Sequence, residues 1–415
     1  MTRILHVNKF LYRRGGAEGY MFDLAEMQAA AGDSVEFFGM TFPDNDPMRF
    51  AAYFPSQVDF DPAPATAAGK VAGLGRMLWS PSASRGMAHV LDEFRPDVVH
   101  FHNIYHQLSP SILQPLKRRG VPSVMTLHDY QLACPTHNFM SHGEICESCM
   151  GGHFSQAVRK RCQNGSVLAS LAGAAELTLH TRLHSYRPID VLICPSRFML
   201  RKMTEAGVYP EKLRLLNHFV TVEEPPKPTV GADFVFAGRL AYEKGVDILI
   251  RAMGSVPEDA GHLHVLGEGP DREELGRLAA EVAPGRVTFH GRVTRAVVVE
   301  RLRAAALSVV PSRWYENQPL SILESFTAGT AVVASDLGGI PELVRDGATG
   351  ATFAPSSVEG LARVLTDLGR DPQRCHALGL AARSWVETEF SPERHLEGVR
   401  AFYAEAMNQV PQPQA

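Results

Sequence analysis

Short apolar segments alternate with helical patterns twice along this chain of 415 residues, on either side of a proline-rich break. The first series is ILHVNKF, SVEFFGM, VVHFHN, SVMTLHD, VLICPS and LRLLNHFV. After the break TVEEPPKPTV, Thr221 to Val230, the second series is FVFAG, LHVLGEG, VTFHG, LSVVPS, AVVASD and ATFAP. Apolar strands that alternate with helices are typical of parallel sheets. The pattern therefore predicts an α/β chain of two doubly wound, Rossmann-like domains.

The predicted domains are residues 1–220 and 221–390, followed by 391–415 as a helix that packs back toward the first domain and a polar tail. Two domains also agree with a usual size of about 100 to 200 residues per domain. Ligands of such sheets bind beyond the carboxyl ends of the strands, so we expect a site in the cleft between the sheets. The small residues of PATAAGKVAGLG, Pro64 to Gly75, predict a loop or mobile helix over this cleft.

Charge and hydropathy exclude some functions and leave others open. A formal net charge of -4 argues against a general nucleic-acid binder, which is normally basic. The apolar run in MTRILHVNKF is too short for a signal peptide or a membrane span, so we expect a cytoplasmic protein. The basic runs LKRRG and VRKRC either face water or meet an anionic membrane that holds a lipid acceptor.

Two glutamates follow the apolar run LSVVPS, in the stretch RWYENQPLSILES. Glu316 lies among turn-forming residues, whereas Glu324 falls within a helix for which Pro319 suits the first position and Gly329 the end. The free backbone amides at the helix start, around Leu320, form an anion site. An acid pair beside an anion site predicts a polar, negatively charged ligand.

A second strand end carries two cations, in GRLAYEKGVDILI. Gly238 allows a tight turn, Arg239 and Lys244 supply positive charge, and Gly245 opens a helix. A diphosphate leaving group suits this arrangement, since charge-assisted hydrogen bonds to phosphate are strong. A solvated turn is the alternative.

Glycines and histidines stand at other predicted strand ends. Gly15 and Gly16, in RRGGAEGY, either bring backbone amides close to a ligand at a helix start or serve a turn. His128 ends SVMTLHD, and His102 and His106 follow VVHFHN. Histidines at such positions serve a site or are satisfied structural residues.

Four of the six cysteines fall within one stretch of about thirty residues, 134–162. Cys134, Cys146, Cys149 and Cys162 include one Cys-x2-Cys pair and could bind a structural zinc ion. Three histidines are further candidate ligands: His137, His142 and His153. Reduced free thiols are the alternative, because the cytosol disfavours disulfides.

These motifs together resemble the retaining nucleotide-sugar glycosyltransferases of family 4, which have the GT-B fold of two Rossmann-like domains facing a central cleft. The resemblance spans nearly the whole chain. It is carried by GGAE from Gly15, GRLAYEKG from Gly238, GEGP from Gly267, the glutamates Glu316 and Glu324, and GGIPELV from Gly338.

The resemblance implies a role for each matched residue. Arg239 and Lys244 would bind the donor diphosphate, Glu324 the ribose hydroxyls and Glu316 the hydroxyls of the transferred sugar. His128 would orient the donor sugar and stabilise charge. The wider set of donor-binding candidates is Gly15, Gly16, Gly238, Glu268, Asn317, Pro319 and Leu320.

The expected activity is transfer of a hexosyl unit from a nucleoside diphosphate sugar to a hydroxyl of a glycan, lipid or small molecule. The resemblance implies retention of the anomeric configuration and no catalytic metal or other cofactor. Asn317 and Gln318 stand where many members carry glycines, so the donor's identity cannot be carried over. A nucleotide-sugar epimerase of the same fold and a noncatalytic sugar-nucleotide sensor are the alternatives.

Overall fold

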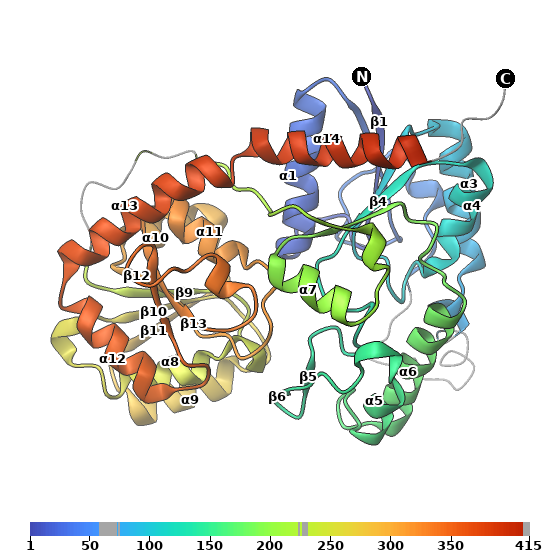
Figure 1. The fold of residues 1–415 in the computed structure, drawn as a ribbon. Helices are drawn as coiled ribbons and strands as arrows, with labels where there is room; N and C mark the ends of the chain where they lie inside the picture. Colours follow the sequence, from blue (N-terminus) through green and yellow to red (C-terminus); the bar gives the residue numbers. More distant parts are fainter. Residues whose placement is uncertain (58–72, 74, 223–224, 226–230, 410–415) are drawn as a thin grey trace.

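The computed structural model describes residues 1–57, 73, 75–222, 225 and 231–409. Figure 1 shows two α/β domains side by side, the first coloured blue to green and the second yellow to orange. The predicted loop over the cleft, Pro64 to Gly75, lies outside the described residues except for Gly73 and Gly75. Most of the proline-rich break also lies outside them.

The N-terminal domain contains a sheet of 6 strands in the order β2, β1, β3, β4, β7, β8, and all the pairings are parallel. The strands are β1 (Arg3–Val7), β2 (Ser34–Phe38), β3 (Val98–Phe101), β4 (Ser123–Thr126), β7 (Val191–Cys194) and β8 (Leu213–Leu215). Every residue of β3, β4 and β7 is buried, because helices cover both faces of the sheet. The doubly wound domain predicted from the first apolar series is confirmed.

Helices and short 3-10 turns connect these strands. They are α1 (Gly16–Ala30), η1 (Ala51–Tyr53), α3 (Pro81–Phe94), η2 (Pro110–Ile112), α4 (Leu113–Arg119), α6 (Val167–Arg182), α7 (Arg197–Glu205) and η4 (Pro210–Lys212). Between β4 and α6 the cysteine-rich segment forms its own small unit. It contains the antiparallel hairpin β5 (Met140–Ser141) and β6 (Glu144–Ile145), then η3 (Met150–Gly152) and α5 (Ser155–Arg159).

The C-terminal domain repeats the architecture with 6 parallel strands in the order β11, β10, β9, β12, β13, β14. The strands are β9 (Phe234–Ala237), β10 (Leu263–Leu266), β11 (Val287–Gly291), β12 (Leu307–Val310), β13 (Ala331–Ser335) and β14 (Gly350–Phe353). The helices are η5 (Tyr242–Lys244), α8 (Val246–Met253), η6 (Glu258–Ala260), α9 (Arg272–Val282), α10 (Arg295–Ala304), α11 (Leu320–Thr327), η7 (Ile340–Glu342), α12 (Val358–Gly369) and α13 (Pro372–Glu389). None of the helices in the described part of the chain is long and apolar enough to cross a bilayer.

The last helix, α14 (Pro392–Gln409), leaves the C-terminal domain and lies across the N-terminal domain, in red in Figure 1. Val399, Tyr403 and Ala406 are buried and pack with Ile4 and Val191 of the first sheet. Their spacing of four and three residues places them on one face of the helix. The chain therefore crosses between the domains after β8 and again at α14.

Candidate functional site

A buried ion pair joins the loop after β9 to the loop after β12. The ammonium Nζ of Lys244 lies 2.7 Å from Oε1 of Glu316, and the Ser312 hydroxyl donates to the same oxygen at 2.7 Å. Gly245 makes this approach possible, since its φ is +67 and a Cβ there would lie 2.0 Å from the Pro311 carbonyl oxygen. The start of α8 therefore lies close to the end of β12, and this brings Lys244 within reach of Glu316.

The carboxyl of Glu316 is ionised in this setting. Burial raises the pKa of Glu316, but the Lys244 ammonium and a hydrogen bond from Ser312 outweigh it and hold the pKa below its ordinary value. An ionised carboxylate only accepts hydrogen bonds. The side chain is therefore suited to bind hydroxyl groups, and Lys244 supplies a positive charge beside it.

The second predicted cation has a different environment. Arg239 is exposed and forms an ion pair with Glu243, four residues along the chain. The tight backbone that the sequence assigns to Gly238 belongs instead to Gly267, whose φ is +142 and whose Cβ would lie 1.9 Å from the Gly238 carbonyl oxygen. Glu268, the exposed neighbour of Gly267, stands at the end of β10.

Two helix starts face one another across the cleft. Helix α1 begins at Gly16 with Gly15 as N-cap, and a Cβ on Gly16 would lie 3.4 Å from Cδ1 of Leu320, the first residue of α11. Pro319 is the N-cap of α11 and not its first helical residue, because its ψ of 114 is extended. Gly329 follows the end of α11 with φ +70, as predicted. Free amides from both domains therefore point toward one space.

Glu324, on α11, borders that space. A small cavity of about 30 Å³ lies between the domains, lined by Tyr20, Asp23, Phe219, Val220, Thr221, Arg295, Leu320 and Glu324. Burial raises the pKa of Glu324, Arg295 opposes the rise and Asp23 adds to it. No hydrogen bond from the described residues reaches the Glu324 carboxylate. The two larger cavities, of about 760 and 480 Å³, include neither glutamate of the predicted pair.

His128 lies at the carboxyl end of a strand of the first sheet, two residues after β4. Its Nε2 is 3.1 Å from Nδ1 of His102, and its ring packs against the rings of Tyr20 and His218. Burial lowers the pKa of His128 to about 3, so the ring is neutral. A neutral imidazole suits orientation of a ligand but not the charge stabilisation that the resemblance implies.

The other two histidines at strand ends have separate roles. His102 is buried behind His128, while Nδ1 of His106 lies 2.9 Å from the Glu176 carboxylate on α6. The structure therefore groups His102 with His128 and leaves His106 outside the site.

The side chains of Asn317 and Gln318 bind the N-terminal domain. The Asn317 amide donates to the Leu127 carbonyl at 3.1 Å and accepts from the Ser196 hydroxyl at 3.0 Å. Gln318 accepts from the backbone amide of His218 at 2.5 Å. These side chains therefore point across the domain interface.

Glu342, which the sequence shows only as part of a motif, forms a second bridge between the two domains. Glu342, in GGIPELV, accepts from the backbone amides of Arg197 at 2.9 Å and Phe198 at 2.6 Å. These amides begin α7, so a side chain of the C-terminal domain caps a helix of the N-terminal domain. Nothing in the spacing of GGIPELV points to that distant partner.

The cysteine-rich segment reaches the loops that carry Lys244 and Glu316. Tyr315 donates to the Glu147 carboxylate at 2.8 Å, and Lys202 lies 2.9 Å from the same group. The Tyr242 hydroxyl donates to the Gly143 carbonyl at 3.4 Å. The segment therefore bridges the two domains beside the predicted site.

The four clustered cysteines are free thiols in one local unit. Burial, followed by the nearby Cys134, raises the pKa of Cys149 to about 12. Burial also raises the pKa of Cys146, but Ser148 and the Lys160 ammonium, 3.2 Å from its sulfur, outweigh it and lower that pKa. Among the described residues, one group of three or more possible metal ligands has all its ligating atoms within 4.8 Å of one another, and its members are three histidines. The thiols do not meet that spacing, so binding one zinc would require them to draw closer.

Comparison with known proteins gives two family matches that cover nearly the whole chain. Residues 14–224 match the model described as "Glycosyltransferase Family 4", and residues 221–385 match "Glycosyl transferases group 1". A glycogen synthase of Mycobacterium tuberculosis is 32% identical over 302 residues, which is 71% of each chain. The fold is similar to that of two proteins of known structure. Sucrose-phosphate synthase from Thermosynechococcus elongatus has a TM-score of 0.71 and 19% identity, over 98% of this chain and 100% of that chain. HepE from Anabaena, in complex with UDP and glucose, has a TM-score of 0.66 and 16% identity, over 97% and 100%.

Proposed function

The chain belongs to glycosyltransferase family 4, and from that premise we propose that it moves a hexosyl unit from a nucleoside diphosphate sugar to an acceptor hydroxyl with retention of configuration. The acceptor is a hydroxyl of a glycan, a lipid or a small molecule. The family membership supports transfer, and the chemistry of the site supports the kind of donor.

One observation carries the proposal: two helix starts and the carboxylate of Glu324 lie close together between the domains. A Cβ on Gly16 would lie 3.4 Å from Cδ1 of Leu320, so the starts of α1 and α11 are near one another, and Glu324 borders the cavity beside them. Helix starts favour phosphate, and carboxylates accept from sugar hydroxyls. A nucleoside diphosphate sugar supplies both groups in one molecule.

We propose that transfer needs no metal ion. Arg239 and Lys244 would stabilise the negative charge that grows on the departing diphosphate, which is the role of a cation in such a site. Glu316 would hold the transferred sugar, and His128 would orient it from the other domain. Unchanged turnover in magnesium-free buffer with chelator added just before the assay supports this, and a requirement for added divalent cation contradicts it.

A lipid acceptor would bring the protein to the inner face of a membrane. Exposed leucines of α6 (Leu168, Leu171 and Leu179), together with Leu183 directly after the helix, support such a contact. Parts of the basic runs are engaged within the protein, since Arg119 pairs with Asp92 and Lys160 bonds to Cys146. Sedimentation with vesicles containing phosphatidylglycerol, compared with neutral vesicles, tests membrane contact directly.

The test of the main proposal begins with a screen of nucleotide sugars by thermal shift. The donor that stabilises the protein is then incubated with candidate acceptors, and the product is followed by NMR. We expect free nucleoside diphosphate and a glycoside with the donor's anomeric configuration. Inversion would contradict the retaining mechanism, epimerised donor without release of nucleotide would indicate an epimerase, and binding without turnover would indicate a sensor.

A further inference from the structure

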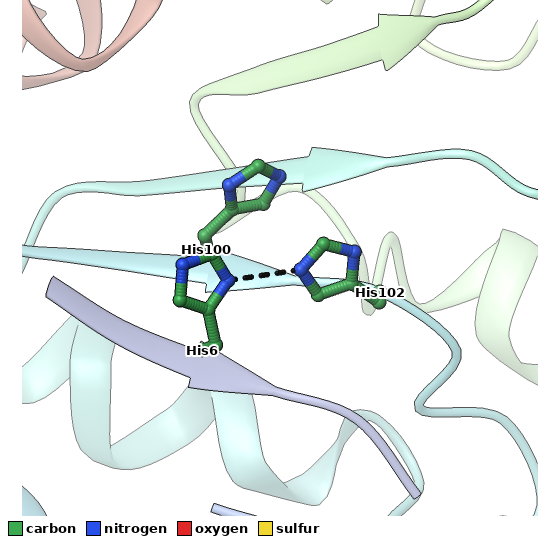
Figure 2. Close-up of side chains that lie close together, drawn as sticks. All are labelled: His6, His100 and His102. Carbon is green, nitrogen blue, oxygen red and sulfur yellow. Dashed lines mark hydrogen bonds between the residues drawn. The ribbon is translucent and has the colours of Figure 1, made fainter. Parts of the chain in front are cut away.

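Three buried histidines lie behind His128 in the core of the N-terminal domain. His6 comes from β1, His100 from β3 and His102 from the residue after β3, and Figure 2 shows their rings beside one another. A hydrogen bond of 3.0 Å joins Nδ1 of His6 to Nε2 of His102. Such a cluster is either a metal site or a hydrogen-bond network, and the partners of each nitrogen decide between them.

Every ring nitrogen of these three residues has a partner. His6 and His102 bond to each other, and their outer nitrogens bond to Gln28 at 2.8 Å and to His128 at 3.1 Å. His100 forms hydrogen bonds of 2.8 Å with the hydroxyls of Tyr403 and Thr126. A metal ion would have to replace these hydrogen bonds, so the geometry favours a network.

The rings in this network are neutral. Burial lowers the pKa of His6 and His395 to about 4 and that of His100 and His102 well below the ordinary value. A neutral imidazole carries one proton and donates from one nitrogen only. Each hydrogen bond therefore fixes the next one along the chain of contacts.

A backbone carbonyl, which can only accept, fixes the proton of a neighbouring histidine. His395 Nδ1 lies 2.7 Å from the carbonyl oxygen of Asn217, so this nitrogen carries the proton. His395 Nε2 must then accept from the Tyr20 hydroxyl at 2.9 Å.

The next steps cross the sheet to the C-terminal helix. His100 forms hydrogen bonds of 2.8 Å with the hydroxyls of Thr126 and Tyr403. Gln28 sets the direction of the next steps, because its amide nitrogen donates to the Tyr403 oxygen at 3.0 Å and its amide oxygen can only accept from His6 Nε2.

The last steps lead to the cleft. His6 donates from Nε2 to Gln28 and accepts at Nδ1 from His102 Nε2. His102 accepts at Nδ1 from His128 Nε2. We infer that this polar relay, from Gln28 through His6 to His102, holds His128 in the single tautomer that is protonated on Nε2 and bare on Nδ1. No described residue forms a hydrogen bond with His128 Nδ1, which leaves that nitrogen for a ligand.

The relay gives His128 a defined chemical preference. A bare nitrogen accepts a hydrogen bond from a hydroxyl, whereas a protonated nitrogen would donate one to the hydroxyl oxygen. If the proposed function holds, this makes His128 an acceptor for a sugar hydroxyl. His102, His6 and Gln28 act only through His128, so they are positioning residues. Tyr403 belongs to α14, so docking of that helix is part of the device.

The test reads the tautomer without substrate. Long-range 1H–15N correlation spectra of the full chain, labelled with 15N-histidine, distinguish protonated from bare ring nitrogens, and the His128→Gln variant assigns the His128 signals. We expect a protonated Nε2 and a bare Nδ1 on His128. A protonated Nδ1, or ring signals typical of a bound metal on His6 and His102, would overturn the inference.

Two variants disturb the relay at different distances. Gln28→Leu removes the acceptor for His6, and the milder Tyr403→Phe removes the hydroxyl that orients Gln28. We expect either change to give His128 a mixed tautomer and to lower kcat about 10-fold or more, with the donor KM changed less than about threefold. Thr288→Val is the matched control, because it removes a 2.8 Å hydrogen bond from His262, outside the relay. An unchanged His128 tautomer in both folded relay variants would overturn the inference.

The tautomer measurement also separates this inference from the proposed function. The expected tautomer together with no transfer from any nucleotide sugar would overturn the function and support the relay. Transfer with retention together with a protonated Nδ1 on His128 would support the proposed function and overturn the relay.

Discussion

At the scale of single residues, Lys244 and Arg239 carry the same charge but differ in what they hold. Lys244 neutralises the buried Glu316, whereas Arg239 is exposed and pairs with Glu243. The sequence predicts both as cations of one clamp and gives no reason to separate them. The partner of Lys244 comes from a distant loop, whereas the partner of Arg239 lies four residues along the chain.

Replacing Lys244 with Ala should therefore impair both catalysis and stability. We expect turnover to fall about 100-fold through loss of transition-state charge stabilisation. The free energy of unfolding should drop by roughly 1–3 kcal/mol, because Glu316 is left ionised and buried without its cation. Arg239→Ala should lower turnover but cost less than about 1 kcal/mol of stability, since its ion pair is exposed. Steady-state kinetics and urea unfolding measure the two effects. If Lys244→Ala and Arg239→Ala were equally stable, Lys244 would not be neutralising Glu316 as described.

The two glutamates should differ in what their loss removes. We expect Glu324→Gln to weaken binding of the nucleoside diphosphate about 10-fold or more, because a hydrogen-bonded charged acceptor is worth about 1.5–3 kcal/mol. Glu316→Gln should leave that binding almost unchanged and lower kcat, since its proposed partner is the sugar. Calorimetric titration with the nucleotide, beside kinetics with the whole donor, separates the roles. Equal losses of nucleotide affinity would contradict the division.

The buried carboxylate of Glu324 should also slightly lower the free energy of unfolding. Burial raises its pKa, so the folded state favours the protonated carboxyl more than the unfolded state does. For a raised carboxyl pKa, stability falls as pH rises from the unfolded value through the folded one. Glu324→Gln should accordingly raise the melting temperature at pH 7 by about 1–2 °C and leave it unchanged near pH 3. A lower melting temperature at pH 7 would show that the carboxylate is stabilised in the fold.

At the scale of elements, the sequence predicts the strands well and the start of one helix less well. Both apolar series become the strands of parallel sheets because period and burial are local properties of each segment. The start of α11 shifts by one residue, since the extended ψ of Pro319 makes it the N-cap. The tight backbone at Gly267 could not be assigned from sequence, because it depends on the approach of Gly238 from another strand.

The cysteine-rich segment is the element whose chemistry most needs measurement. We predict about one zinc ion per chain after purification under reducing conditions, bound by Cys134, Cys146, Cys149 and Cys162. Their sulfurs would draw together on binding, and the metal would order a segment with a small apolar core. Elemental analysis of the protein gives the ratio directly. Cys149→Ser should lose the zinc, whereas Cys194→Ala, a buried thiol in β7, should retain it. Clearly less than one zinc with four titratable thiols would leave these residues as ordinary cysteines.

At the scale of the whole molecule, the parts that sequence could not supply lie between the domains. Local pattern and resemblance predict the loops after strands that carry Lys244, Glu316 and His128, and the helix that carries Glu324. The hydrogen bonds that Asn317 and Glu342 make to Ser196, Leu127 and α7 join positions more than a hundred residues apart. No spacing along the chain encodes such pairs, so the arrangement of the two domains had to come from the structure.

These cross-domain bonds should set how readily the cleft closes. Asn317 contributes two side-chain hydrogen bonds to the N-terminal domain, each worth about 0.5–1.5 kcal/mol net. Asn317→Gly removes both without filling the space, and Glu342→Gln weakens the cap of α7. A less favoured closed state lowers the apparent affinity in proportion to its population. We therefore expect the double variant to bind the nucleoside diphosphate roughly 10-fold more weakly and to show a larger radius of gyration in solution scattering. Asp346→Asn is the matched control, because its hydrogen bonds with Thr352 stay within the C-terminal domain. Unchanged affinity and radius in the double variant would show that other contacts hold the domains together.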